Sequence, residues 1–186
     1  MGSLEKKFYE FVIKAVSEVY KKDKYLIDNK AVLEPLYAFQ ENEDFDSDKN
    51  RYYHVSERAI VFRFAHYLQN IINEDSDKSF LDYHLDCEYN RNIARVKQLP
   101  KSLNKFIPDV ILHKRGNNKN NFAVMEFKVC WSKVGVDYDE VKITQLTKQG
   151  NGFNYKCGFA IIFNQECDQV EYRVYKDGKC IEDRML

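Results

Sequence analysis

The chain has 186 residues, of which 44% are hydrophobic and 15% aromatic, which is enough to bury the core of a single domain. Lysine plus arginine equal aspartate plus glutamate at 29 each, so the net charge by itself gives no support to nucleic-acid binding. No apolar run approaches the ~20 residues that a membrane-spanning helix needs. The N-terminus is too charged for a signal peptide, and we therefore expect a cytoplasmic protein without a membrane partner.

Two amphipathic helices are predicted in the first half of the chain, over residues 4–22 and 56–73. Both have apolar side chains at three- and four-residue spacing, which places them on one face of a helix. Ser56 is the expected N-cap of the second helix, so Glu57 falls in its first turn. An acid at that position complements the helix dipole, and this is the structural alternative to a functional role for Glu57.

The segment between these helices, residues 23–50, carries an acidic run from 41 to 48 and is expected to be a solvent-exposed loop. We expect one domain over the whole chain. An N-terminal helix and the acidic loop would occupy residues 1–50, and the main core would occupy residues 51–176.

Five strands are predicted in the rest of the chain, over residues 79–90, 107–114, 121–131, 155–164 and 169–176. The fourth is apolar throughout, which is typical of a strand buried on both faces. A helix over residues 137–149 precedes it, with Asp139, Lys142, Gln145 and Gln149 on its polar side. This order of elements indicates an α/β fold, with a mixed β-sheet flanked by helices.

The second and third strands form a predicted hairpin around an asparagine-rich loop. If the loop is centred on Asn117 and Asn118, Asp109 lies directly opposite Glu126 on one face of the sheet. Opposed side chains have Cβ atoms roughly 5 Å apart, and like charges placed that way repel unless a cation lies between them. Lys128 projects from the same face, because side chains alternate along a strand. Two acids and one ammonium group on one face suit a site for a hard divalent metal ion.

Charge is distributed unevenly along the chain. Residues 91–128 hold 9 Lys/Arg against 2 Asp/Glu, whereas residues 1–90 hold 12 against 18 and residues 129–186 hold 8 against 9. A local positive field beside a metal site suits a polyanionic substrate such as nucleic acid. The alternative is a solvated basic loop without a ligand.

Other metal sites and disulfides are not expected. The cysteines are odd in number and have no close pairing, which favours buried, reduced thiols in a cytosolic protein. They are Cys87, Cys130, Cys157, Cys167 and Cys180. The histidines show no metal-ligand spacing either; they are His54, His66, His84 and His113.

The hairpin and its surroundings resemble the PD-(D/E)XK nuclease superfamily, whose members share the restriction-endonuclease-like fold. Pro108–Asp109 precedes the hairpin turn, and Glu126–Phe127–Lys128 follows it. A helix carrying an acid, Glu57, lies upstream, and a crossover helix and a buried strand lie downstream. The resemblance covers roughly residues 55–165.

This resemblance implies a Mg²⁺-dependent hydrolase, a nuclease acting on DNA phosphodiester bonds, in which Mn²⁺ can replace Mg²⁺. Asp109 and Glu126 would be the carboxylates that hold the metal, with the carbonyl of Phe127 as a further ligand. Glu57 would be an additional metal ligand or would support one. Lys128 would lie beside the attacking water and the scissile phosphate, where a compact positive charge offsets developing negative charge.

Two further residues take roles from the same resemblance. Gln145 occupies the place on the following helix where many members carry a glutamine or lysine that faces the substrate, and its alternative is a plain solvent-facing amide. Glu88, near the end of the first predicted strand, is another acid that could approach the site.

Several alternatives stay open. Asp109 and Lys128 could form only a cross-strand ion pair, worth roughly 0–1 kcal/mol. The chain could be a nuclease-fold protein that has lost catalysis and serves as a binding or assembly module, or its substrate could be RNA or branched DNA. No separate DNA-reading module is recognisable in the sequence, so a partner protein or a homodimer would supply further contacts to DNA.

Overall fold

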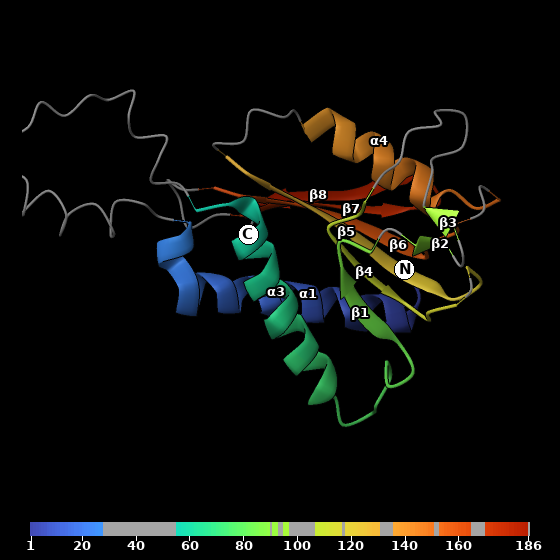
Figure 1. Ribbon diagram of the computed structural model, residues 1–186, viewed down its shortest axis with the longest axis horizontal. Coiled ribbons are helices and arrows are strands. Elements are labelled where there is room, and N and C mark those ends of the chain that lie inside the picture. Colours follow the sequence, from blue (N-terminus) through green and yellow to red (C-terminus); the bar gives the residue numbers. More distant parts are fainter. Residues whose placement is uncertain are drawn as a thin grey trace, which may run out of the picture.

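A six-stranded mixed sheet forms the centre of the computed structural model, with helices on both faces (Figure 1). The structure describes residues 1–27, 55–89, 91–92, 95–96, 107–116, 118–130, 136–150, 153–164 and 170–185. Its helices are α1 (Ser3–Asp23), η1 (Lys24–Leu26), α3 (Glu57–Asn73) and α4 (Val136–Thr147). The sheet contains β1 (His84–Cys87), β4 (Val110–His113), β5 (Asn121–Val129), β6 (Cys157–Phe163), β7 (Val170–Lys176) and β8 (Lys179–Met185). A separate two-stranded ribbon pairs β2 (Arg91–Asn92) with β3 (Arg95–Val96).

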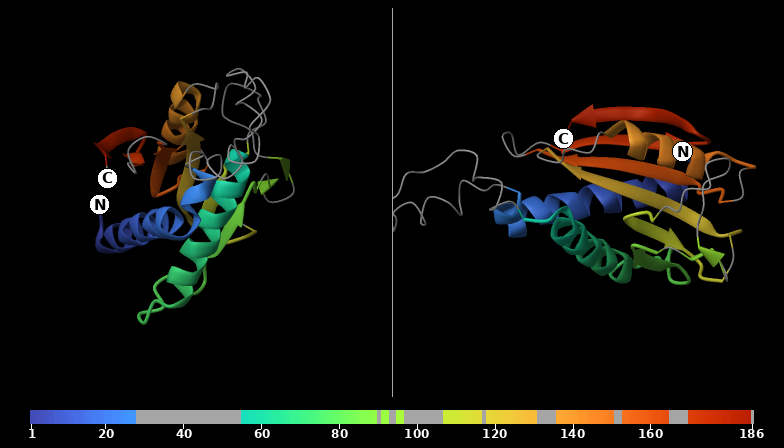
Figure 2. Two further views of the ribbon diagram at one scale, coloured as in Figure 1. Left: turned by 90° about the vertical axis from the view of Figure 1, so that its left-hand side faces the viewer. Right: turned by 45° about the horizontal axis from the view of Figure 1, so that its top comes forward.

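The strands lie in the order β1-β4-β5-β6-β7-β8, and Figure 2 shows β1 and β8 at opposite edges. All neighbours are antiparallel except β5 and β6, which are parallel and connected through α4. A parallel pair needs such a crossover, and helices on both faces explain why every residue of β6 is buried. The α/β class and mixed sheet expected from the sequence are thus confirmed.

One face of the sheet packs against α1 and α3 through an aromatic core. Phe8 of α1 contacts Phe80 and Phe122 edge to face, with ring centroids 5.3 and 5.4 Å apart. On α3, Phe64 lies 4.7 Å from Phe127 of β5. Since Glu57 lies two turns before Phe64 on α3, this contact fixes the start of α3 next to the end of β5.

The other face packs against α4 through a smaller apolar cluster. Ile143 and Leu146 of α4 lie against Ile111, Val124 and Ala160 of the sheet. Gly158 of β6 permits this close approach, because a Cβ atom there would lie 2.4 Å from Cγ2 of Ile143. The absence of a side chain at Gly158 therefore determines how closely α4 packs on β6.

The hairpin register matches the sequence prediction. Val110 pairs with Met125 and Leu112 with Ala123, and the register shifts only after Leu112, towards the turn. Continued by one residue, the register places Asp109 opposite Glu126. The predicted helices over residues 4–22, 56–73 and 137–149 correspond to α1, α3 and α4.

Three sequence predictions were wrong. The first strand covers only His84–Cys87 rather than 79–90, because hydrogen-bonded turns precede it and Glu88 has φ 47° at its end. The strand β8 was not predicted, because its mostly exposed residues lack an alternating pattern. Among the described cysteines, which are all free, Cys157 is buried as expected but Cys87, Cys130 and Cys180 are exposed.

The acidic run of residues 41–48 lies outside the residues that the structure describes, as does most of the basic stretch between 91 and 106. Ser56 is the N-cap of α3 by position, as predicted, although its side chain makes no capping hydrogen bond. The α1 side chains share one core with the sheet and α3, so the N-terminal helix is part of the main fold.

Candidate functional site

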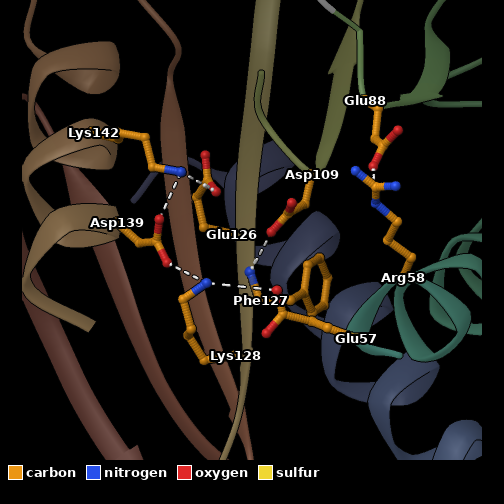
Figure 3. Close-up of polar contacts among 9 residues, drawn as sticks. All are labelled: Glu57, Arg58, Glu88, Asp109, Glu126, Phe127, Lys128, Asp139 and Lys142. Atoms are coloured by element: carbon orange, nitrogen blue, oxygen red, sulfur yellow. Dashed lines mark hydrogen bonds and ion pairs between the residues drawn. The ribbon is translucent and has the colours of Figure 1, made fainter. Parts of the chain in front are cut away.

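Asp109 and Glu126 lie next to each other where β5 extends past the start of β4 (Figure 3). Asp109 precedes the first residue of β4, and its Oδ2 accepts a hydrogen bond from the Phe127 backbone N–H at 2.8 Å. Glu126 projects from β5 and is only 2% exposed. The hairpin register therefore places two acids together with little access to water for one of them.

Lys128, two residues further along β5, reaches acids from both helical layers. Its Nζ lies 2.8 Å from Oδ2 of Asp139 on α4 and 3.5 Å from Oε1 of Glu57 on α3. Glu57 can approach because β4 begins opposite Met125. The last residues of β5 are therefore not paired with β4 along that edge. Among the described residues no ion pair joins Lys128 to Asp109, so the cross-strand pair considered from the sequence does not form.

Two residues of α4 complete the group, and sequence reasoning gave them no role. Lys142 Nζ lies 2.7 Å from Oε2 of Glu126 and 2.6 Å from Oδ1 of Asp139. Asp139 thus lies between the two lysines, as Figure 3 shows. We call this set the acid–lysine cluster; it comprises Glu57, Asp109, Glu126, Lys128, Asp139 and Lys142.

A signal for these two residues was present in the sequence. Asp139, Lys142 and Gln145 recur every three residues on the polar side of α4, so they share one side of the helix. A helix that crosses between two parallel strands must lie over the sheet, which brings that side near β5. Gln145, the residue chosen from the sequence, is half-buried one turn beyond Lys142.

Burial controls the electrostatics of the acids. It raises the pKa of Glu126 well above its usual range, and the neighbouring Asp109 raises it further while Lys142 opposes the shift. Burial also raises the pKa of Asp109, against the hydrogen bond from Phe127, and that of Glu57, against the charge of Lys128. These acids are therefore costly to ionise where they lie.

The lysines are shifted in the complementary direction. Although burial opposes it, the charges of Glu126 and Asp139 raise the pKa of Lys142. Asp139 does the same for Lys128, again against burial. In the cluster four carboxylates face two ammonium groups, so two negative charges stay unbalanced when all six groups are ionised.

This donor set fits a hard divalent cation. Oε1 of Glu126 and Oε2 of Glu57 are buried and have no hydrogen-bond partner in the described part of the chain. An ion of charge +2 would balance the two excess charges, and carboxylate oxygens are the ligands it prefers. As the side chains lie, however, no three Asp, Glu, His or Cys residues among those described converge closely enough to hold one ion.

The side of Asp109 away from α4 opens into a pocket of about 460 Å³. Glu57 also lines it, so two acids of the cluster are reachable from this side. Glu88 lies at the pocket as well and forms an ion pair with Arg58 at 2.8 Å (Figure 3). The approach of Glu88 to the site, considered from the sequence, is therefore found, although an arginine already pairs with it.

Comparison with known proteins adds no assignment: the chain matches no protein-family model, no curated protein and no solved structure. None of the helices in the described ranges is long and apolar enough to cross a membrane.

Proposed function

We propose that this chain is a Mg²⁺-dependent nuclease with a restriction-endonuclease-like core, which hydrolyses DNA phosphodiester bonds in the cytoplasm. The observation that carries the proposal is the acid–lysine cluster. Glu126 and Asp139 are buried, the pKa values of Glu57, Asp109 and Glu126 are raised, and one oxygen each of Glu57 and Glu126 has no hydrogen-bond partner among the described residues. Groups held in such a costly state beside a pocket are candidates for a functional site rather than a structural one.

Asp109 and Glu126 would hold the metal ion, with Glu57 and the Phe127 carbonyl as the further ligands suggested by the resemblance. When bound, an ion of this kind lowers the pKa of water and polarises phosphoryl oxygens. Mn²⁺ would occupy the same oxygen ligands.

Lys128 supplies the positive charge that a phosphate at Asp109 would meet. Its ammonium group is held by Asp139 and Glu57, from the layers on either side of the sheet, so its position does not depend on substrate. A charge placed in advance stabilises a transition state without reorganisation at the moment of reaction. Asp139 acts here as a positioning residue.

The choice of nucleic acid as substrate rests on charge. The basic excess of residues 91–128 precedes and includes the hairpin that carries Asp109 and Glu126. Phosphate contacts by lysine and arginine dominate affinity for nucleic acids. A homodimer or a partner protein would extend this contact surface.

One observation favours a second candidate, a nuclease-fold protein that binds nucleic acid or assembles with a partner without cutting. Lys142 occupies one oxygen of Glu126 and one of Asp139, so an ammonium group already fills part of the space that a cation would take. In an active enzyme Lys142 must share Glu126 with the metal. In an inactive one it would replace the metal.

The experiment that separates the candidates is a cleavage assay on plasmid, linear duplex DNA, single-stranded DNA and RNA. Each is incubated with Mg²⁺, with Mn²⁺ or with EDTA. We expect metal-dependent cutting that disappears in Asp109→Ala and Lys128→Ala. Glu18→Ala and Lys22→Ala are matched controls, since these residues form an ion pair on α1, outside both the cluster and the basic stretch of residues 91–128.

The opposite result would be equally informative. If no substrate is cut and calorimetry detects no binding of Mg²⁺ or Mn²⁺, the nuclease proposal is wrong and the binding module is favoured. If RNA or branched DNA is cut in preference to linear duplex DNA, the chemistry stands and the substrate changes.

A further inference from the structure

The pocket beside the cluster combines acids with exposed apolar side chains. Glu57, Glu88 and Asp109 line it together with Phe62 and Ile107. Phe62 is 65% exposed and Ile107 is 47% exposed. A single exposed apolar residue needs no explanation, but two large ones at one pocket next to a candidate site form a surface that a ligand can cover.

Without a bound metal ion, the described lining of the pocket is unfavourable for a phosphate. Among the described residues, three carboxylates line it, against one guanidinium, that of Arg58, which already pairs with Glu88. In the absence of the metal ion, a phosphodiester placed there would meet a net negative charge from these described residues, so the phosphate belongs at the metal ligands. The pocket is better suited to a neutral group with apolar faces and a polar edge.

Phe62 offers an exposed aromatic ring at the pocket. It follows Arg58 by one turn of α3, so both side chains lie on the same side of the helix. Aromatic rings stack on nucleobases of any sequence, and arginine adds planar, hydrogen-bonding contacts beside the ring. Glu88 and Arg58 at the same pocket can exchange hydrogen bonds with the edge of a base.

We propose that this pocket binds one unpaired nucleobase of a single-stranded nucleic acid, with the base stacked on Phe62 and its neighbouring phosphate at Asp109. The inference rests on the proposed nuclease function and specifies its substrate class. A base in a duplex is stacked on both faces and paired along one edge, so it cannot enter such a pocket while it stays in the duplex. A base of a single strand can. The chain would therefore prefer single-stranded segments to duplex.

The test measures binding rather than turnover. The full-length chain carrying Lys128→Ala, used to prevent cleavage, is titrated in Mg²⁺ into a short single-stranded oligonucleotide that contains the fluorescent base 2-aminopurine. Phe62→Ala is then added to this background. Stacking is typically worth about 1–3 kcal/mol per base by alanine substitution, which corresponds to roughly 5- to 100-fold weaker binding of the single strand.

Two variants control for general effects. Phe62→Trp keeps an aromatic ring and should retain binding and the quenching of 2-aminopurine fluorescence. Leu81→Ala removes another exposed apolar side chain, 73% exposed and distant from this pocket, and should change nothing. Binding of a blunt duplex of the same sequence should be weaker and insensitive to Phe62→Ala.

Three outcomes would overturn the inference: unchanged single-strand binding in Phe62→Ala, equal weakening for single strand and duplex, or no binding of single strands at all. Failure of the proposed function is separate. If the wild-type chain cuts no nucleic acid, the nuclease proposal fails, whereas cutting of duplex and single strand alike with no effect of Phe62→Ala overturns only the base pocket.

Discussion

Two groups of charged side chains beside the sheet differ in how fully their carboxylates are paired with cations. In the first, which we call the histidine cluster, Asp86 accepts hydrogen bonds from Arg115 and from His113, whose Nε2 lies 2.8 Å from Asp86 Oδ2. Although burial opposes it, these partners lower the pKa of Asp86. Glu57, Asp109 and Glu126 of the acid–lysine cluster show the opposite shift, because burial raises their pKa values and the nearby lysines do not offset it.

The difference indicates which group is structural. A carboxylate with a lowered pKa contributes to stability when ionised. The histidine cluster therefore has a structural role in stabilising the fold. A buried carboxylate with a raised pKa costs stability at neutral pH, and such costs are typical of sites kept for function. Proximity of charges alone would not have separated the two groups.

The largest expected effect is a difference in activity between two variants, each with one aspartate of one cluster replaced. Asp109→Asn should lower metal-dependent cleavage at least about 100-fold, because a divalent ion contributes several kcal/mol to transition-state stabilisation. Asp86→Asn should leave the rate near that of wild type at temperatures where the protein is folded. Initial rates on the preferred substrate check both variants. They are measured at 20 °C, or at another temperature at least about 15 °C below the lower of the two variants' unfolding midpoints.

The next effect is stabilisation by metal. At a concentration of Mg²⁺ about 100 times its Kd, the folded chain should gain about 2.7 kcal/mol, which raises the unfolding midpoint by roughly 5–10 °C. Glu126→Gln should abolish most of this gain, whereas Asp86→Asn should keep it. Thermal unfolding with Mg²⁺ and with EDTA measures the shift, and an equal gain in both variants would place the ion elsewhere.

The packing of α4 offers a way to disturb one cluster without the other. Gly158→Ala should push α4 away from β6, because the new Cβ would lie 2.4 Å from Ile143 Cγ2. Overpacking of this kind typically costs about 1–3 kcal/mol. It should also lower activity, since α4 carries Asp139 and Lys142, while Asp86 keeps its partners.

A double-mutant cycle provides the control. Ile143→Ala removes the nearer of the two atoms that the new Cβ would crowd, the other being Thr147 Cγ2 at 2.9 Å, so the double variant with Gly158→Ala should be more stable than the sum of the two single effects predicts. Free energies of unfolding from urea titrations test this. Strict additivity would show that α4 does not pack on Gly158 in this way.

The smallest expected effect is on the pH dependence of stability in EDTA. Glu126 has a raised pKa, so the wild-type chain should lose stability as the pH rises above 4.5, its ordinary value, and Glu126→Gln should lose less, since only Asp109 and Glu57 then keep raised pKa values. Asp86 has a lowered pKa, so its contribution is present above 3.8 and is lost as the pH falls below that value. The two variants should therefore differ from wild type with opposite signs at neutral pH.

Unfolding midpoints measured between about pH 3 and pH 8 test these signs. Relative to wild type, Glu126→Gln should become more stable as the pH rises. Asp86→Asn should become less stable over the same range. A shift of the same sign in both variants would mean that the two clusters do not differ in the way their contacts indicate.

Much of the fold follows from local patterns in the sequence. Apolar spacing gave α1, α3 and α4, and the asparagine-rich turn gave the register that brings Asp109 to Glu126. These features depend on neighbours a few residues away, which is why a single sequence can predict them. The edge strand β8 is different: it is a strand because β7 offers it hydrogen bonds, and its own exposed residues carry no pattern.

The candidate site divides in the same way. The sequence by itself determined that Asp109, Glu126 and Lys128 share one face of a hairpin. Only the tertiary structure decided that Glu57 meets Lys128 through the open end of β5, and that Asp139 and Lys142 enter from α4. The reason is that side chains on separate elements meet only after the layers pack, and here a glycine at 158 and the aromatic contact of Phe64 with Phe127 set that packing.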